Sequence, residues 1–479
     1  MKSNLVYSVI GVVFQTLFPL IIYPYITRVL GVANLGEYNF YASTVAFLAL
    51  FSGFGISLYG TKEIGKRKDD IQAYSVVFGE LVSINLIMSF IIYILIFVLI
   101  LFAESYQNYK LFLITSITII GNAVGAEYLF VALEKQKFML IRNIIFKILS
   151  LVFIFSFVRD ESDLIAYAII MLISTAGVSV TNILNYINKI DWKVIRLKNF
   201  HIAACIIPLV QVFIMDTMNH YYGTMDIVIL GNLDTVESVG YYSVASKIYF
   251  LSYTFLASTA VPLLPRAAYY IENRLFVEYD AMLRRCYDIY LLIILFSSFV
   301  LFFYAEDIIV LVSGEEFRQG YKALQLFALT LLPGSFCNLF IFEVLYPKNK
   351  NKFVLTMLSI SIVINLILSV VLIPAMSYMG AAVAFLSSFV ILFVLFVVGG
   401  RKELPHFEGN RDFVKEIVGI GACYGACVLL KYTSIHFIIQ LVLCSLLFFL
   451  IEFVLRNDTA IYLYQLVKNR IKARSRNNE

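Results

Sequence analysis

"YSVVFGELVSINLIMSFIIYILIFVLILF" occupies residues 74–102, and Glu80 is its single charged residue. A helix needs about 20 mostly apolar residues to cross about 30 Å of hydrocarbon, so this run is long enough to span a membrane. The whole chain is of the same kind: 61% of its 479 residues are hydrophobic and 14% are charged, whereas soluble domains average about 25% charged residues. The sequence therefore predicts an integral membrane protein.

Similar runs recur along the whole chain. They are continuous over about twenty residues, which is typical of helices, whereas outer-membrane strands alternate over about ten. The expected fold is all-α, because a helix satisfies its own backbone polar groups in lipid. About fourteen spans are predicted, at 5–27, 38–60, 74–102, 111–133, 141–158, 164–187, 202–230, 239–262, 284–304, 323–345, 353–374, 380–400, 413–431 and 436–455.

The distribution of Lys and Arg gives the orientation. Cytoplasmic loops retain basic residues. Of the 37 Lys and Arg, 29 fall in the amino terminus, the loops after even-numbered spans and the carboxyl tail, six fall in the other loops, and Lys147 and Lys247 lie inside spans. We therefore expect a multi-pass protein of the cytoplasmic (inner) membrane with both termini in the cytoplasm. The net charge of +5 follows from this topology, and we expect no nucleic-acid partner.

Two stretches of the first half recur in the second. Residues 26–43, "ITRVLGVANLGEYNFYAS", match 226–246, with Gly36 aligned to Gly240, and residues 136–155 match 351–370. Six spans separate the copies, so the repeats are parallel and related by an axis along the membrane normal. We predict a six-helix lobe at 1–187, a cytoplasmic connector at 188–201, a second six-helix lobe at 202–400, and two additional helices with a basic tail at 401–479.

Four stretches carry a resemblance to a known family: "PYITRVLGVANLGEYNF" (24–40), "DIVILGNLDTVESVGYYSVASKI" (226–248), "GEEFRQGYKALQL" (314–326) and "MGAAVAFLSSF" (379–389). In their order and spacing the chain resembles the polysaccharide transporter or oligosaccharide flippase (Wzx-type) family of the multidrug/oligosaccharidyl-lipid/polysaccharide exporter superfamily. The resemblance implies two lobes around a central cavity that opens alternately to each side. It also implies outward movement of polyprenyl-pyrophosphate-linked oligosaccharides.

Span 7 is unusually polar for a membrane helix. Asp216, Asn219, Gly223 and Asp226 follow one another at steps of three or four residues, which places them on one helical stripe with His220 beside it. A charged residue at mid-bilayer costs about 2.5–3.5 kcal/mol, so it normally faces a wet cavity or a partner. The stripe predicts a cavity-lining helix.

Basic residues are the expected partners of a lipid pyrophosphate. Lys247, Arg28 and Lys147 are our candidates, and Gln15 is a candidate for contacting sugar, as Asn219 is for lining the cavity. The alternatives stay open: Lys247 pairs permanently with an acid of span 7, Arg28 contacts lipid headgroups, and Lys147 extends back to the membrane surface. Arg142, near the start of the same span, is expected to reach the surface in that way.

Gating and energy coupling involve a second set of residues. Arg28 and Asp226 occupy nearly equivalent places in the two repeats with opposite charges, so we hypothesise that they form part of an outer gate. Asp216, His220 and Glu127 are candidates for carrying a coupling ion. The energy source is a proton gradient, a sodium gradient or the membrane potential. Glu343, close to the cytoplasmic boundary, is expected to be solvated or paired.

Enzyme classes find no support in the sequence. It has no Walker A motif, no GxSxG elbow and no HExxH. We expect no cofactor and no metal. The alternatives to an oligosaccharide flippase are a lipid II-type peptidoglycan precursor flippase and a multidrug exporter of the same superfamily. The expected partners are the lipid-linked oligosaccharide, membrane lipids, and a polysaccharide polymerase with its chain-length machinery.

Overall fold

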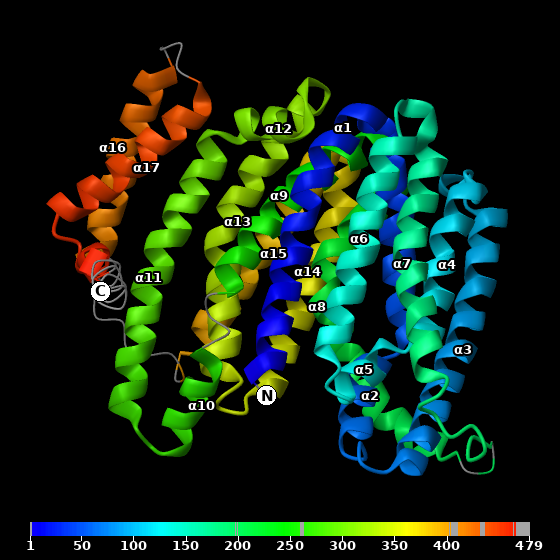
Figure 1. The fold of residues 1–479 in the computed structure, drawn as a ribbon. Helices are drawn as coiled ribbons and strands as arrows, with labels where there is room; N and C mark the ends of the chain where they lie inside the picture. The colour runs from blue at the N-terminus through cyan, green and yellow to red at the C-terminus, as the bar shows by residue number, and fades with distance from the viewer. Residues whose placement is uncertain are drawn as a thin grey trace, which may run out of the picture. The chain divides into compact units, whose positions relative to one another are not determined.

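The computed structural model describes residues 2–196, 198, 200–258, 263–401, 403, 411–431, 436–462 and 464–465. Within these residues the chain is helical and contains no strand (Figure 1). The α-helices are α1 (Lys2–Gly53), α2 (Ile56–Gly65), α3 (Ile71–Phe102), α4 (Tyr109–Gly125), α5 (Glu127–Ala132), α6 (Gln136–Phe157), α7 (Leu164–Tyr186), α8 (Ile202–Leu233), α9 (Val236–Ser258), α10 (Leu264–Glu272), α11 (Phe276–Phe303), α12 (Ala305–Ser313), α13 (Tyr321–Leu339), α14 (Asn351–Met376), α15 (Tyr378–Gly399), α16 (Arg411–Lys431) and α17 (Phe437–Val454). Short helical turns lie at η1 (Glu104–Tyr106), η2 (Glu161–Asp163), η5 (Glu315–Gly320) and η6 (Phe340–Leu345), the last of them a π-helix.

The predicted all-α membrane fold is confirmed. A helix lies over each of the fourteen predicted spans, and ten helices of the described chain are long and apolar enough to cross a membrane. The prediction of a loop between the first two spans is wrong: α1 continues through it and departs from helical geometry at Gly31 (φ 71°, ψ 179°). Glycine accepts this positive φ because it has no Cβ. A kink at one residue therefore replaces the expected loop.

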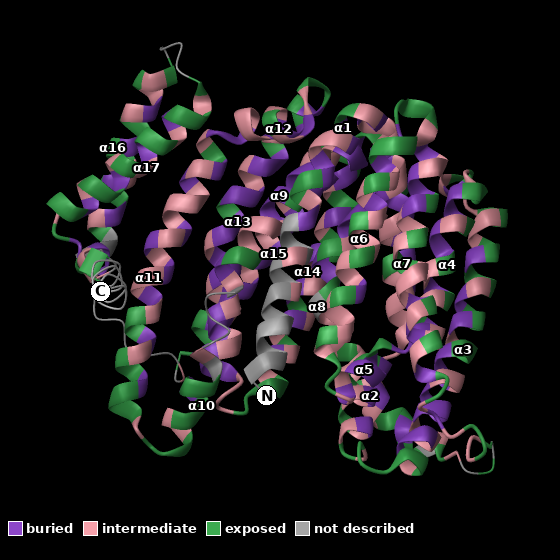
Figure 2. Cartoon of the chain, in the orientation of Figure 1, coloured by how far each residue is buried: buried purple, intermediate pink, exposed green. Residues whose placement is uncertain are grey.

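Burial separates helices that face lipid from helices that form the core. In their most apolar windows, α3 and α6 are 28% and 17% buried, whereas the segment Glu315–Leu345, which contains α13, is 72% buried (Figure 2). The exposed side of α3 carries large apolar residues such as Phe90 and Phe97. In water such a surface would drive aggregation, and in a bilayer it meets acyl chains.

The first of two compact units comprises Met1–Val244, Leu311–Phe317 and Leu368–Ala381. Helix α1 packs on α4, α6 and α8, and α4 packs on α7. The core of this unit includes Phe78, Leu81, Leu129 and Phe130, all nearly inaccessible. Helix α8 belongs to this unit. The lobe boundaries predicted from the repeats stay a prediction.

Within the first unit, α1 crosses the beginning of α9 at two glycines. A methyl group on Gly36 would lie 1.9 Å from the carbonyl oxygen of Val236, and one on Gly240 would lie 2.5 Å from that of Val32. The two contacts are equivalent: exchanging the two repeat copies turns one into the other, because Gly36 aligns with Gly240 and, at the same offset, Val32 aligns with Val236. The repeat therefore has local two-fold symmetry where its copies meet. The next equivalent pair also meets: the Asn39 side chain donates a hydrogen bond to Ser243 Oγ at 2.9 Å.

The second unit comprises Ala245–Val310, Arg318–Ile367 and Ala382–Glu479. Its core is aromatic: the rings of Tyr249 on α9, Phe327 on α13 and Phe385 on α15 lie with centroids 5.1–5.4 Å apart. Helices α16 and α17 pack on each other, and α16 packs on α11. A cluster of buried residues, including Cys423, Cys427, Cys444 and Phe448, joins these three helices. The two additional helices are thus attached to this unit through α11.

Candidate functional site

Arg28 lies where α1 meets the last turn of α12. Its guanidinium donates hydrogen bonds to the carbonyl oxygens of Leu311 (2.6 Å) and Val312 (3.3 Å), and to that of Pro24 in its own helix (2.6 Å). The last carbonyls of a helix lack intrahelical partners and carry partial negative charge, so a cation stabilises them. The side chain remains exposed. Arg28 therefore connects α1 to α12 and still presents its charge to the surroundings.

Asp226 is buried near the end of α8. It is 2% exposed, and Tyr242 Oη of α9 donates a hydrogen bond to its Oδ2 at 3.2 Å. A buried carboxylate needs such donors because it has lost its water. The proposed gate pair of Arg28 and Asp226 remains a hypothesis.

Asp216 and His220, one turn apart on α8, form a pair. His220 Nδ1 lies 3.4 Å from Asp216 Oδ1, and their side chains are 59% and 40% exposed. A carboxylate beside an imidazole is an arrangement that can hold or pass a proton. The predicted neighbour Asn219 and the candidate Gln15 have side chains outside the described residues.

The two lysines predicted to lie inside spans differ in their surroundings. Lys147 on α6 is partly buried, with Nζ 4.4 Å from the centroid of the Phe18 ring on α1. This cation–π contact joins α6 to α1 within the first unit. Lys247 on α9, in the second unit, is exposed although Ser246 and Ile248 beside it are buried. The predicted cavity lining draws on both units and stays a prediction.

Arg142 does not extend to the surface as expected. It is 4% exposed, and its guanidinium donates hydrogen bonds to Glu127 Oε1 at 2.9 Å and to Asn182 Oδ1. Asn182 in turn donates to the carbonyl oxygen of Gly125 at 2.8 Å. These contacts join α4, α5, α6 and α7. The sequence signal for this network was the pair of opposite charges at the starts of consecutive helices.

Glu343 is shielded from solvent and has no ion-pair partner in the part of the chain that the structure describes, contrary to expectation. It lies in the π-helix η6, has no exposed surface, and neither carboxylate oxygen has a hydrogen-bond partner among the described residues. Tyr279 Oη instead donates to the main-chain oxygen of Glu343 at 2.9 Å. A π-helix often marks a functional position, and burying a lone polar group is costly. The sequence analysis identified Glu343 within an apolar run and was wrong about its surroundings.

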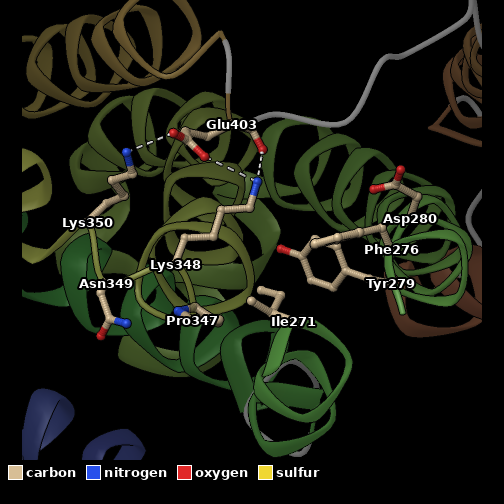
Figure 3. A pocket seen from close by; sticks show the side chains of 9 residues that line it. All are labelled: Ile271, Phe276, Tyr279, Asp280, Pro347, Lys348, Asn349, Lys350 and Glu403. Carbon is tan, nitrogen blue, oxygen red and sulfur yellow. Dashed lines mark hydrogen bonds and ion pairs between the residues drawn. The ribbon is translucent and has the colours of Figure 1, made fainter. Parts of the chain in front are cut away.

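A pocket of about 540 Å³ opens beside the start of α14. Lys348 and Lys350 point toward Glu403 in Figure 3: Lys350 Nζ lies 2.9 Å from its carboxylate, and Lys348 donates to its main-chain oxygen at 2.7 Å. The hydrogen bond from Lys350, together with Lys348, lowers the pKa of the Glu403 carboxyl. The carboxylate lies between the two lysines and offsets part of their positive charge at the pocket.

Comparison with known proteins places the chain in a family. The family model described as "Polysaccharide biosynthesis protein" matches residues 1–269, more than half of the sequence. The chain belongs to this polysaccharide biosynthesis family. A second model, "Lipid II flippase MurJ", matches residues 228–452. The resemblance to Wzx-type transporters expected from the sequence is thus confirmed.

Curated relatives of this family member are few and distant. A putative O-antigen transporter of Escherichia coli (strain K12) is 24% identical over 251 residues, which are 52% of this chain and 60% of that protein. A putative O-antigen transporter of Shigella dysenteriae is 27% identical over 35% of this chain and 42% of its own. The matched region therefore spans about 60% or less of these relatives.

Solved structures share the fold of this family member over a greater length. The lipid II flippase MurJ in an inward closed conformation has a TM-score of 0.72 at 18% identity, covering 95% of this chain and 99% of its own. An inward-facing MATE family multidrug transporter has a TM-score of 0.60 at 14% identity, covering 83% and 97%. At these identities the likeness establishes the fold.

Proposed function

We propose that the protein is a flippase that moves polyprenyl-pyrophosphate-linked oligosaccharide repeat units across the cytoplasmic membrane for surface polysaccharide assembly, whether capsule, O-antigen or exopolysaccharide. The observation that carries the proposal is the polysaccharide biosynthesis family match over residues 1–269. The O-antigen transporters among its relatives support the substrate class, and the MurJ-like fold supports the transport mode. We infer a transporter and no enzyme activity.

Alternating access requires contacts that close one side and then separate. The glycine crossing of α1 and α9 and the bond of Arg28 to α12 meet this description, since both join helix ends that the proposed topology places outside. At the crossing the two backbones meet directly at the glycines, the Val32 side chain lies beside Gly240, and Asn39 donates one side-chain hydrogen bond to Ser243. Separation of the two helices would break these contacts. We propose that these contacts form the closed outer gate.

The substrate's two charged phosphates need cationic partners during transit. We assign this role to Lys247, Arg28 and Lys147, with Gln15 and Asn219 for uncharged groups. Arg28 has guanidinium donors on carbonyl oxygens in this structure, and a phosphate is a stronger acceptor than a carbonyl. Substrate binding would therefore compete with the bond to α12, which couples arrival of the pyrophosphate to release of the outer gate.

Energy coupling is assigned to acids in the first unit. Asp216 with His220 forms the leading candidate, because the carboxylate and the imidazole lie next to each other and both remain accessible. Glu127, ion-paired with Arg142, and Asp226, bonded to Tyr242, follow. A proton gradient, a sodium gradient and the membrane potential are the sources to be tested, by collapsing each separately during transport.

A lipid II-type flippase is the second candidate, because the MurJ family model matches residues 228–452. The two functions differ in the sugar that the transported lipid carries. Rescue of a strain depleted of its lipid II flippase would identify the second function, whereas rescue of surface polysaccharide in a strain lacking its oligosaccharide flippase would identify the first.

We also propose the membrane and the orientation: the cytoplasmic membrane, with both termini in the cytoplasm. The grouping of 29 of 37 basic residues supports this topology. Reporter fusions at the two termini and after Asp234 should give cytoplasmic, cytoplasmic and external signals. A polysaccharide polymerase and chain-length machinery are the proposed partners on the outer side.

The deciding experiment is depletion of the protein in its host. Lipid-linked oligosaccharide should accumulate on the inner leaflet, inaccessible to an impermeant sugar-oxidising reagent, while lipid II stays at its normal level. Accumulation of lipid II in place of the oligosaccharide would reject the proposal.

A further inference from the structure

A second pocket of about 540 Å³ lies within the second unit, outside the residues discussed so far. It is formed by α10, α11 and the segment that follows α17, and its lining includes Arg266, Tyr270, Arg285 and Tyr462. Apolar side chains such as Met282 and Ile289 complete it. The pocket therefore combines a cationic side with an apolar side.

The cationic side consists of two exposed arginines. Arg266 Nε donates a hydrogen bond to Tyr270 Oη at 3.0 Å, and the Arg285 guanidinium lies 4.7 Å from the centroid of the Tyr462 ring. Within the described part of the chain, neither guanidinium forms an ion pair with a carboxylate. Glu278 is the single acid among the described lining residues. The pocket has a net positive charge, and aromatic rings orient both guanidiniums.

The apolar side follows the surface of α11. Met282, Arg285 and Ile289 succeed one another at steps of three and four residues, so they lie on one stripe of a membrane-spanning helix. Arg285 lies between the two apolar side chains, and Ile289 lies on the side toward the middle of the helix. At the turn between α10 and α11, Phe276 is 56% exposed and Val277 81% exposed. A ligand that fits this stripe has an anionic group at one end and an apolar chain at the other.

We propose that this pocket binds the headgroup of an anionic phospholipid, with the phosphate between Arg266 and Arg285 and an acyl chain along Ile289, on the membrane side of Arg285. Planar guanidiniums suit phosphate oxygens because each offers paired donors. The inference rests on the proposed topology, which places this turn at the cytoplasmic leaflet, where anionic lipids concentrate. The site would anchor α10 and the segment after α17 to that leaflet.

Direct binding tests this site without any transport measurement, so its failure is distinguishable from failure of the proposed function. The detergent-purified full chain is titrated with phosphatidylglycerol, with phosphatidylcholine and with inorganic phosphate, and lipid adducts are counted by native mass spectrometry. The test variant is R266Q/R285Q. The control is R274Q/R284Q, which removes the same charge from the same turn at residues that do not line the pocket.

We expect phosphatidylglycerol to bind in preference to phosphatidylcholine, and R266Q/R285Q to weaken it roughly 25-fold, about 5-fold for each arginine. R274Q/R284Q should bind it like the unmodified chain. Equal losses in both double variants would show general surface charge and overturn the proposal. Inorganic phosphate binding as tightly as phosphatidylglycerol, and lost in R266Q/R285Q, would also overturn the lipid assignment.

A third variant tests the apolar side and does not depend on the folding of the arginine variant. Ile289→Trp keeps both arginines and fills the stripe on the membrane side of Arg285. Phosphatidylglycerol binding should fall at least 5-fold, since the acyl chain loses its position. Unchanged phosphatidylglycerol binding in Ile289→Trp would contradict the proposed pose.

Discussion

The segments at the starts of α6 and α14 align in the predicted repeat, yet the acids that shortly precede them have different surroundings. Before α6, Glu127 is 52% exposed and bonds to Arg142. Before α14, Glu343 is fully buried, and Met357 occupies the position that aligns with Arg142. In the first copy a cation neutralises the acid, and the network around the pair joins α4, α5, α6 and α7. In the second copy the acid lies in an apolar site. The two copies therefore share the path of the backbone but differ in the partners of their acidic side chains.

At the crossing of α1 and α9, by contrast, the two copies make equivalent contacts. There Gly36 and Gly240 make reciprocal contacts, and Asn39 meets its counterpart Ser243. Residues that touch across a two-fold axis constrain each other, because a change in one copy alters a contact of the other. Residues away from the axis are free of that constraint. Differences in sequence between the two copies should therefore concentrate away from the two-fold axis, at positions where the copies have different functions.

The largest effect is expected from locking the crossing. In a background without the six native cysteines, N39C/S243C should cross-link under oxidation, because the two side chains are within hydrogen-bond distance. Transport should stop completely and return on reduction, since the gate must part in each cycle. The single variants N39C and S243C are the controls. Full transport by the cross-linked protein would remove the crossing from the mechanism.

Adding a methyl group at the crossing should be nearly as disruptive. Gly36→Ala places a carbon against the Val236 carbonyl, which forces the helices apart and should cost about 1–3 kcal/mol of stability. Gly421→Ala is a matched control, because a methyl there meets no atom within 4 Å. Thermal unfolding in detergent measures both. Equal stability of the two variants would mean that the crossing is not closely packed.

The next largest effect is expected from breaking the ion pair of Glu127 with Arg142. Arg142→Met removes the buried donor shared by Glu127 and Asn182 and should destabilise the first unit by about 1–3 kcal/mol. Lys137→Met, at an exposed position on the same helix, should change stability little. If Arg142→Met were as stable as the control, the network would be dispensable and the contrast between the repeats would lose its physical basis.

The smallest effect on stability is expected from replacing Glu343, whose carboxylate has no partner in the described chain. Glu343→Met replaces a buried group that has no partner in the described chain with an apolar one of similar size, so unfolding should be unchanged or shifted upward by up to about 1 kcal/mol. Unfolding and transport are measured on the same preparation. A loss of stability above about 2 kcal/mol would show that Glu343 has a partner, and the two repeats would then be alike.

The sequence was informative about what depends on composition and spacing. Apolar runs located the helices, and the aligned pair Gly36 and Gly240 marked the place where two repeats touch. The kink at Gly31 was not predicted, because a continuous helix and a loop have the same composition there. Arg142 and Glu343 were misjudged for a related reason: the depth and partners of a charged side chain depend on neighbouring helices, which periodicity within one helix does not reveal.

Reconstitution tests the central claim most directly. Purified protein in liposomes is supplied with a fluorescent polyprenyl-pyrophosphate oligosaccharide on one leaflet, and its arrival on the other leaflet is followed with an impermeant quencher. We predict movement by the unmodified protein that stops in cross-linked N39C/S243C and resumes on reduction. Movement at the same slow rate in protein-containing and protein-free liposomes, under each imposed gradient, would contradict the account.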